Sequence, residues 1–230
     1  VLQHGFLSLH AEESGTDRQT NPPANTAASV KYIGSDQCVT CHENQHQSFL
    51  QTLHSKAARF TDVALEPPAG EFKHNLSGHR YRVEVADGKM FHSEHRLSET
   101  GESLGETKMQ MSVTLGSGAH SQSYLGRIGD FHIESPITYF RDNESWAMSP
   151  GYDVPAHQSF RREVTVGCVF CHVGSIKQTK HDPYKFEIVE ATIGCERCHG
   201  PGELHAKRHQ KNATLTADLT HDDDTIVNPK

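Results

Sequence analysis

Residues 194–209 read Gly-Cys-Glu-Arg-Cys-His-Gly-Pro-Gly-Glu-Leu-His-Ala-Lys-Arg-His, and the organisation of the whole chain follows from them. Two cysteines separated by two residues precede a histidine. Thiols at this spacing can form thioethers with the two vinyl groups of a haem, while the adjacent imidazole binds its iron. The pattern occurs three times, as a first motif (Cys38, Cys41, His42), a second motif (Cys168, Cys171, His172) and a third motif (Cys195, Cys198, His199). The sequence therefore predicts three covalently bound haem c groups.

Two other uses of the cysteine pairs compete with this interpretation. A structural zinc site would join the second and third pairs, but their separation exceeds the usual spacing, and the first pair would have no partner. A disulfide framework needs no histidine after each pair, and 230 residues is long for a cysteine-stapled scaffold. Haem attachment uses all 6 cysteines and also explains the histidine after each pair. We therefore favour haem over zinc or disulfides.

The composition supports a cofactor-filled interior. Apolar residues make up only 34% of the chain, whereas histidine occurs 18 times. A porphyrin is a large apolar plate, so three haems would replace part of an aliphatic core, and three irons would have six axial positions for histidine. We therefore expect a mixed, loop-rich fold: a haem-packed multihaem cytochrome c with short helices at the haem motifs and small antiparallel β hairpins.

The net charge of −7 makes nucleic acid an improbable partner and favours redox partner proteins. No run of 18 apolar residues occurs, so we expect no transmembrane segment. The chain starts without a charged and then apolar signal segment, which is typical of a mature form. Haem attachment of this kind takes place outside the cytoplasm, and we therefore expect a periplasmic or otherwise exported protein.

Three regions are predicted along the chain. Residues 1–31 are small and polar and form a flexible leader or tether, because they cannot bury enough surface to offset the entropy of ordering. Residues 32–211 form the trihaem domain. Residues 212–230 form an acidic tail and a candidate truncation point, and the run Asp222-Asp223-Asp224 in it is expected to be solvated.

Local patterns predict the main elements. Ser35 or Asp36 can cap a helix at the first motif, and residues 43–59 contain no Gly or Pro, which favours a continuous helix. Alternation over residues 80–86, followed by Asp87-Gly88, predicts a hairpin. Met148 lies beside the single tryptophan, and we expect it to pack in a core rather than to bind iron.

Four histidines are candidates for the distal side of an iron. His54 is more than three helical turns beyond His42, so it can reach only a neighbouring haem. His120 follows a flexible glycine pair, and His205 follows the break at Gly200-Pro201-Gly202, which frees it to point toward a different haem than His199 does. His74 lies in a short loop before the hairpin and is the weakest of the four. The alternative for each is a solvated or packed histidine.

Several segments resemble multihaem c-type cytochromes, among them the tetrahaem electron carriers of ammonia oxidation and the multihaem cytochromes joined to tetratricopeptide repeats. The resemblance covers residues 32–210, and its most specific part is Cys-Glu-x-Cys-His-Gly-Pro-Gly-x-x-His, from Cys195 to His205. It implies that His54 and His205 are distal ligands of neighbouring haems. The chain departs from these relatives in having three motifs and no tetratricopeptide repeat, which suggests a fragment or a processed product.

The leading functional prediction is an exported trihaem electron carrier with mainly bis-histidine haems, which form an electron-conducting chain and need no catalytic residue. Its expected partners are redox proteins, including other multihaem cytochromes. The rival is a haem enzyme in which one open iron acts on peroxide, a nitrogen oxide or a sulfur oxyanion. A third alternative is a docking module within a larger assembly.

Overall fold

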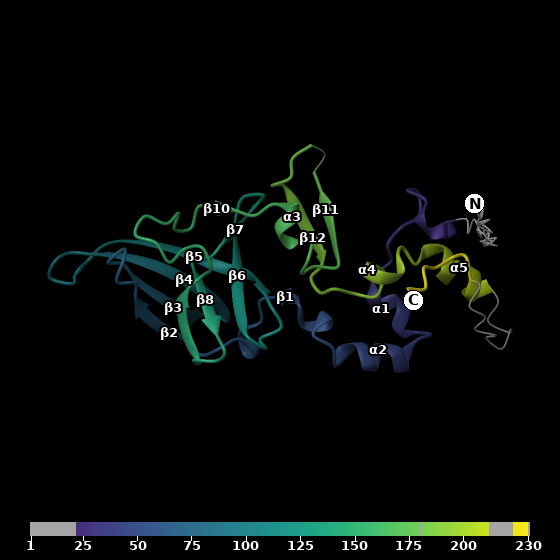
Figure 1. The fold of residues 1–230 in the computed structure, drawn as a ribbon, viewed down its shortest axis with the longest axis horizontal. Coiled ribbons are helices and arrows are strands. Elements are labelled where there is room, and N and C mark those ends of the chain that lie inside the picture. The colour runs from purple at the N-terminus through teal and green to yellow at the C-terminus, as the bar shows by residue number, and fades with distance from the viewer. Residues whose placement is uncertain (1–21, 180, 212–222, 230) are drawn as a thin grey trace, which may run out of the picture.

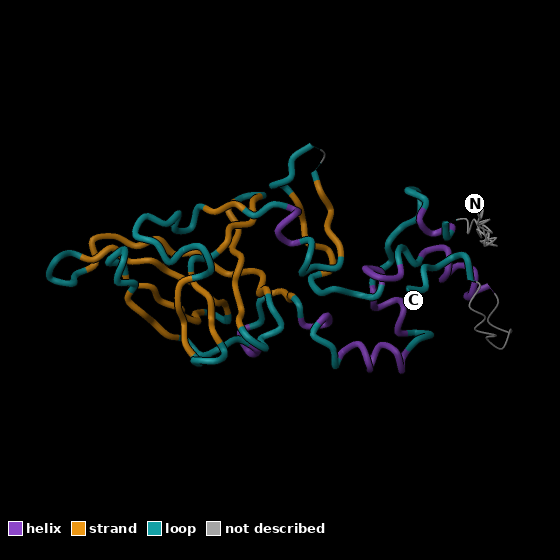
Figure 2. Tube along the Cα trace, viewed as in Figure 1, coloured by secondary structure: helices purple, strands orange, loops and turns teal. Residues whose placement is uncertain are grey.

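The computed structural model describes residues 22–179, 181–211 and 223–229. Strands gather at one end of the molecule and helices at the other, as Figure 1 and Figure 2 show. A hairpin of β11 (Ser175–Gln178) and β12 (Phe186–Glu190) lies between them, beside the helix of the second motif, α3 (Val166–Val169). The expectation of antiparallel strands, loops and a few short helices is therefore confirmed.

One ten-stranded antiparallel sheet fills the strand end of the molecule. Its main order is β10-β7-β6-β5-β4-β3-β2, while β1 pairs with β5, β8 with β6, and β9 with β8. The strands are β1 (Ala58–Phe60), β2 (Gly70–Lys73), β3 (Arg80–Ala86), β4 (Lys89–Leu97), β5 (Ser103–Leu115), β6 (Ser121–Ile128), β7 (Phe131–Glu134), β8 (Ile137–Phe140), β9 (Ser145–Met148) and β10 (Arg162–Glu163).

The predicted hairpin is present within this sheet. Strands β3 and β4 pair in register from Arg80↔His95 to Ala86↔Lys89, and Asp87 and Gly88 form the turn with φ values of 50° and 69°. Alternating residues such as Tyr81 and Val83 are buried, as the period of two requires.

The expectation of small antiparallel hairpins is confirmed only in part. The hairpins join into one large sheet that has its own core, which includes Tyr81, Trp146 and Met148. The physical reason is that an isolated two-stranded hairpin is at best marginally stable, whereas several strands with a shared apolar face are stable together. Met148 belongs to this core, as predicted.

The helices are short: η1 (Ala24–Thr26), α1 (Ser35–Val39), α2 (Glu43–Leu50), η2 (His54–Lys56), η3 (Val63–Leu65), α3, α4 (Glu196–His199) and α5 (Glu203–Lys211). The expectation that the helix continues to His54 is wrong, since α2 ends at Leu50. The Thr52 hydroxyl donates to the Phe49 carbonyl and the Ser55 hydroxyl to the Leu50 carbonyl, so side chains take the acceptors of the last turn. None of the described helices combines the length and the apolar character needed to cross a bilayer.

Glu196, between the cysteines of the third motif, holds the segment before the first motif. Its carboxylate is 4% exposed and accepts backbone N–H groups from Ile33 at 2.9 Å, from Gly34 at 2.7 Å and from Gly202 at 2.7 Å. A buried carboxylate is tolerated only when such donors replace water. Glu196 therefore helps to fix the first and third motifs to each other, together with the Cys195 N–H, which donates to the Ser35 hydroxyl at 2.8 Å.

Both ends of the described chain also pack on the third motif. The amide of Asn25, a fully buried side chain, donates to the His199 carbonyl at 2.9 Å. The Val227 N–H donates to the same carbonyl at 3.0 Å, and the Ala24 N–H donates to the Asp224 carbonyl at 2.6 Å. The described residues on either side of the predicted trihaem domain thus contribute to the environment of this motif.

Replacing Gly126 by alanine should destabilise the sheet. A β-carbon at Gly126 would meet the Met109 side chain and would lie 2.9 Å from the Gln110 carbonyl oxygen. We expect the free energy of unfolding to fall by about 1–3 kcal/mol. Denaturant unfolding followed by far-UV circular dichroism measures this. The matched control is Gly105→Ala in β5, where nothing lies within 4 Å of the added carbon. Equal effects of the two changes would contradict the close packing at Gly126.

Replacing Glu196 by glutamine should loosen the junction of the first and third motifs. The glutamine amide would place its own N–H group against at least one backbone N–H that now donates to the carboxylate. The remaining hydrogen bonds would no longer be to a charged group. The free energy of unfolding should therefore fall by about 1.5–3 kcal/mol. The same unfolding measurement tests it. Glu187→Gln, at an exposed position of β12, should change the free energy little. A Glu196→Gln protein as stable as the control would show that the carboxylate is not the link.

Candidate haem-binding site

Each motif forms about one turn of helix. The His42 N–H donates to the Cys38 carbonyl at 2.9 Å, and the His199 N–H donates to the Cys195 carbonyl at 3.0 Å. In the second motif the His172 N–H donates to the Val169 carbonyl at 2.9 Å. Such a turn presents two thiols and one imidazole from consecutive positions, which is what thioether attachment to a single porphyrin requires.

The first and third motifs face one cavity of about 200 Å³. The lining residues come from both motifs, from α2 and η2, and from the segment before α4: Cys38, His42, Gln45, His46, Phe49, His54, Ile193, Gly194, Cys195, Cys198 and His199. The cavity therefore brings one predicted distal ligand, His54, together with two predicted proximal ligands.

All six cysteines are free thiols. Cys41, Cys168, Cys171 and Cys198 are exposed, and Cys38 and Cys195 are half-buried. Burial, followed by the nearby Cys195 and Glu196, raises the pKa of the Cys38 thiol to about 12. Six unpaired thiols, grouped in pairs each followed by an imidazole, fit the donor set that covalent haem needs.

His199 is oriented by the C-terminal segment. Its Nδ1 lies 2.8 Å from the Val227 carbonyl oxygen, to which it can only donate, so the neutral ring keeps a lone pair on Nε2. Metal-binding histidines commonly donate their other ring N–H to a carbonyl or carboxylate in this way. The contact fixes the ring orientation of this predicted proximal ligand.

The ring of His205, on α5, lies beside the ring of His42. The two ring centroids are 6.0 Å apart and the ring planes differ by 22°. Two imidazoles at this separation could both bind one metal ion, with metal–nitrogen bonds of about 2.0 Å. Burial, followed by the charges of His205, His199 and His209, lowers the pKa of His42, and the neutral ring is the form that binds a metal.

Asp223 orients the His205 ring. Its carboxylate lies 2.9 Å from His205 Nδ1 and 2.9 Å from His209 Nε2, and it also pairs with Arg208. Burial opposes ionisation of Asp223, but hydrogen bonds from Thr225, His209 and His205 outweigh it and hold its pKa far below the usual value. The prediction that this acidic segment is solvated is therefore wrong at Asp223, because α5 supplies cationic and hydrogen-bonding partners.

The other two candidates differ in their surroundings. His120 is exposed in the turn between β5 and β6, and Gly116 in that turn donates its N–H to the Ala57 carbonyl at 2.7 Å, just after η2. His74 is buried in the sheet, where Nδ1 faces Ser77 at 2.8 Å and Nε2 faces Asp153 at 2.9 Å. Both ring nitrogens of His74 are thus engaged, and the structure does not bring it to a motif.

Arg197 links the second motif to the third. Its guanidinium stacks on the Phe170 ring, 3.7 Å from the centroid, and Nη2 donates to the Phe170 carbonyl at 2.8 Å. Phe170 and Arg197 occupy the positions between the two cysteines of their own motifs. No contact of Arg197, Glu196 or Asp223 is predicted from the sequence. The sequence shows that Glu196 and Arg197 are charged residues inside the third motif, but it does not show which groups they contact.

The family described as "Cytochrome c554 and c-prime" matches residues 37–78 and 142–200. These segments contain all three motifs and leave out strands β3 to β8. Among solved structures, the chain titled "Crystal Structure of Outer Cell Wall Cytochrome OcwA" has 20% sequence identity and a TM-score of 0.48 over 78% of this chain and 34% of that chain. The present chain thus spans about a third of that cytochrome's length. No curated protein matches the chain.

The resemblance found in the sequence is therefore confirmed at the level of the protein class. The matched segments carry every Cys-x-x-Cys-His motif, and the cavity, the free thiols and the oriented imidazoles suit the same cofactor. The chain is similar to multihaem c-type cytochromes over the segments that carry its three motifs.

Proposed function

We propose that this chain transfers electrons as an exported trihaem c-type cytochrome with mainly bis-histidine irons. The observation that carries the proposal is the pair of His42 and His205 rings, 6.0 Å apart, with His205 oriented by Asp223. When bound, haem iron supplies a one-electron couple, and its potential depends on axial ligands, burial and hydrogen bonds.

The three motifs would hold the cofactors in parallel ways. The thioethers would form at Cys38 and Cys41, at Cys168 and Cys171, and at Cys195 and Cys198, with His42, His172 and His199 as proximal ligands. His205 would be the distal ligand opposite His42. His54 would be the distal ligand opposite His199, because it lines the same cavity as that residue and the third cysteine pair.

Two contacts would keep the cofactors in electron-transfer proximity. The first and third motifs share a cavity and are joined by Glu196, while Arg197 and Phe170 join the second motif to the third. The third motif is therefore the natural middle of the conducting chain. Redox proteins, including other multihaem cytochromes, are the proposed partners, and the periplasm or the cell exterior is the proposed location.

The second motif supports the rival function, a haem enzyme. Among the described residues, no histidine ring pairs with His172 in the way that His205 pairs with His42. His120 is the remaining distal candidate for this iron. If His120 does not bind, the iron would have an open position that could bind peroxide, a nitrogen oxide or a sulfur oxyanion.

The spectrum of the holoprotein separates the two functions. For the carrier we expect a mass increased by three haems, a low-spin visible spectrum, and no rapid binding of carbon monoxide after reduction, because every iron already has two imidazoles. Mass spectrometry and optical titration with carbon monoxide measure this. Binding of one carbon monoxide per chain would favour the enzyme, and a mass equal to that of the bare polypeptide would contradict both functions.

Replacing His205 by alanine should remove the distal ligand from one of the three irons. The iron bound by His42 should become high-spin and bind carbon monoxide when reduced, while the other two irons stay unchanged. Electron paramagnetic resonance and optical spectra measure the change. The control is His209→Ala, four residues further along α5, which also removes a contact to Asp223 but should leave all irons low-spin. Identical spectra for the two variants would overturn the pairing of His205 with His42.

A further inference from the structure

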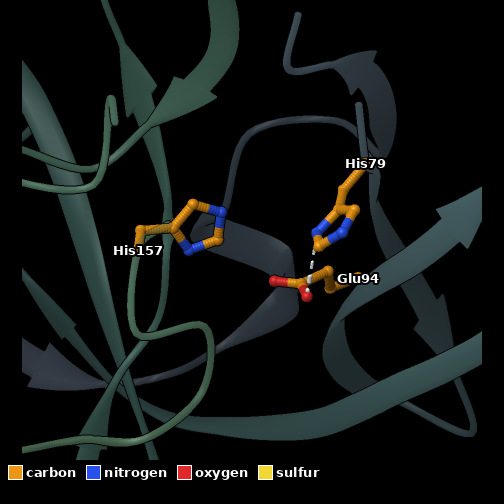
Figure 3. A group of neighbouring side chains, drawn as sticks. All are labelled: His79, Glu94 and His157. Atoms are coloured by element: carbon orange, nitrogen blue, oxygen red, sulfur yellow. Dashed lines mark ion pairs between the residues drawn. The ribbon is translucent and has the colours of Figure 1, made fainter. Parts of the chain in front are cut away.

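A cluster of side chains that could hold a metal ion lies at one face of the sheet, on residues not used by the haem motifs. It consists of His79, Glu94 and His157, drawn in Figure 3. One ligand atom from each of them lies within 4.8 Å of the other two. His79 directly precedes β3, Glu94 is on β4, and His157 is in the connection from β9 to β10. Three separate segments therefore converge on one point.

The strand register explains part of this convergence. Tyr81 and Glu94 are opposite each other in the pairing of β3 with β4, so their side chains share one face of the sheet. His79 is two residues before Tyr81, which directs it to the same face. His157 then approaches from the connection above this face, where its ring is turned toward Glu94 and His79 (Figure 3).

The contact between His79 and Glu94 has the geometry of two ligands rather than of a hydrogen bond. His79 Nδ1 lies 3.1 Å from Glu94 Oε1, yet this buried nitrogen has no hydrogen-bond partner. Two ligands with metal bonds of 2.0–2.2 Å are about 2.9 Å apart at a right angle and about 3.4 Å apart at the tetrahedral angle. The observed separation lies between these values, as expected for two lone pairs directed at one ion.

Tyr81 supports the other side of the cluster. Its hydroxyl donates to Glu94 Oε2 at 3.1 Å and lies 2.7 Å from His157 Nε2. A hydrogen bond to one carboxylate oxygen leaves the other free for an ion and fixes the carboxylate orientation, which is the usual role of groups around a metal site. Tyr81 is fully buried, so this arrangement is built into the sheet core.

His157 offers Nε2 to the cluster. The Ser159 N–H donates to His157 Nδ1 at 3.1 Å, so a metal bound at Nε2 requires the ring proton to move to Nδ1 and this amide to turn away. Ser159 lies in the same connection from β9 to β10, outside any strand. A metal at Nε2 would also replace the contact of this nitrogen with the Tyr81 hydroxyl, which can stay bonded to Glu94 Oε2.

From these contacts we propose that His79, Glu94 and His157 bind one divalent transition-metal ion, for which zinc is the natural probe. Two imidazoles and one carboxylate form an established zinc ligand set that leaves a fourth position for water. The ion would join the start of β3, strand β4 and the connection that leads on to β10 and the second motif. The proposal does not depend on the haem assignment, because none of these residues belongs to a haem motif.

Zinc binding by the holoprotein tests the proposal. After treatment with a chelator and addition of zinc chloride, we expect one tightly held zinc per chain, measured by elemental analysis relative to the protein concentration from amino-acid analysis. Bound zinc should also raise the melting temperature of the sheet, followed by far-UV circular dichroism. Glu94→Gln, which keeps the size of the side chain, should weaken zinc binding at least ten-fold.

Two further variants serve as a control for a changed carboxylate and as a second test of the ligand set. Glu71→Gln changes an exposed carboxylate on the neighbouring strand β2 and should bind zinc as the unmodified protein does. His157→Gln changes a loop residue and should weaken zinc binding even if Glu94→Gln disturbs folding. The proposal is overturned if the unmodified protein holds no zinc, or if the Glu94 and His157 variants bind it as tightly as the Glu71 variant.

Discussion

The two charged residues inside the third motif constrain how the helical end of the molecule is assembled. Glu196 is buried and accepts N–H groups from the segment before the first motif, and Arg197 stacks on Phe170 in the second motif. A buried carboxylate without donors would be costly, so the position of residues 33 and 34 relative to the third motif is strongly specified. The spacing of the motifs is thus set by protein contacts as well as by any cofactor between them.

The strand end and the helical end of the molecule are stabilised by different interactions. The sheet has an aromatic and methionine core of its own, whereas the longest helix near the motifs, α5, has 9 residues. Helices of this length are marginal without tertiary packing. In the proposed function, porphyrins provide that packing at the helical end, and the sheet does not need it.

Local signals in the sequence were sufficient for some features and not for others. Alternation and Asp87-Gly88 predict the β3–β4 hairpin, and cysteine spacing predicts the attachment motifs. The extent of the sheet depends on pairings such as Ala58↔Leu115, and no local pattern specifies a partner so distant in the chain. His74 lies in the predicted loop, but Ser77 and Asp153 occupy its ring nitrogens, and contacts of this kind appear only in three dimensions.

A high histidine content is therefore an ambiguous sign of axial iron ligands. His92 is fully buried against Tyr124 and Trp146 in the sheet, and burial lowers its pKa to about 3, so it is a neutral packing residue. His199 and His205 differ in that Nδ1 is held by a carbonyl or a carboxylate, which leaves Nε2 available beside a motif. The orientation of the ring, rather than the number of histidines, distinguishes a candidate ligand from a residue of the core.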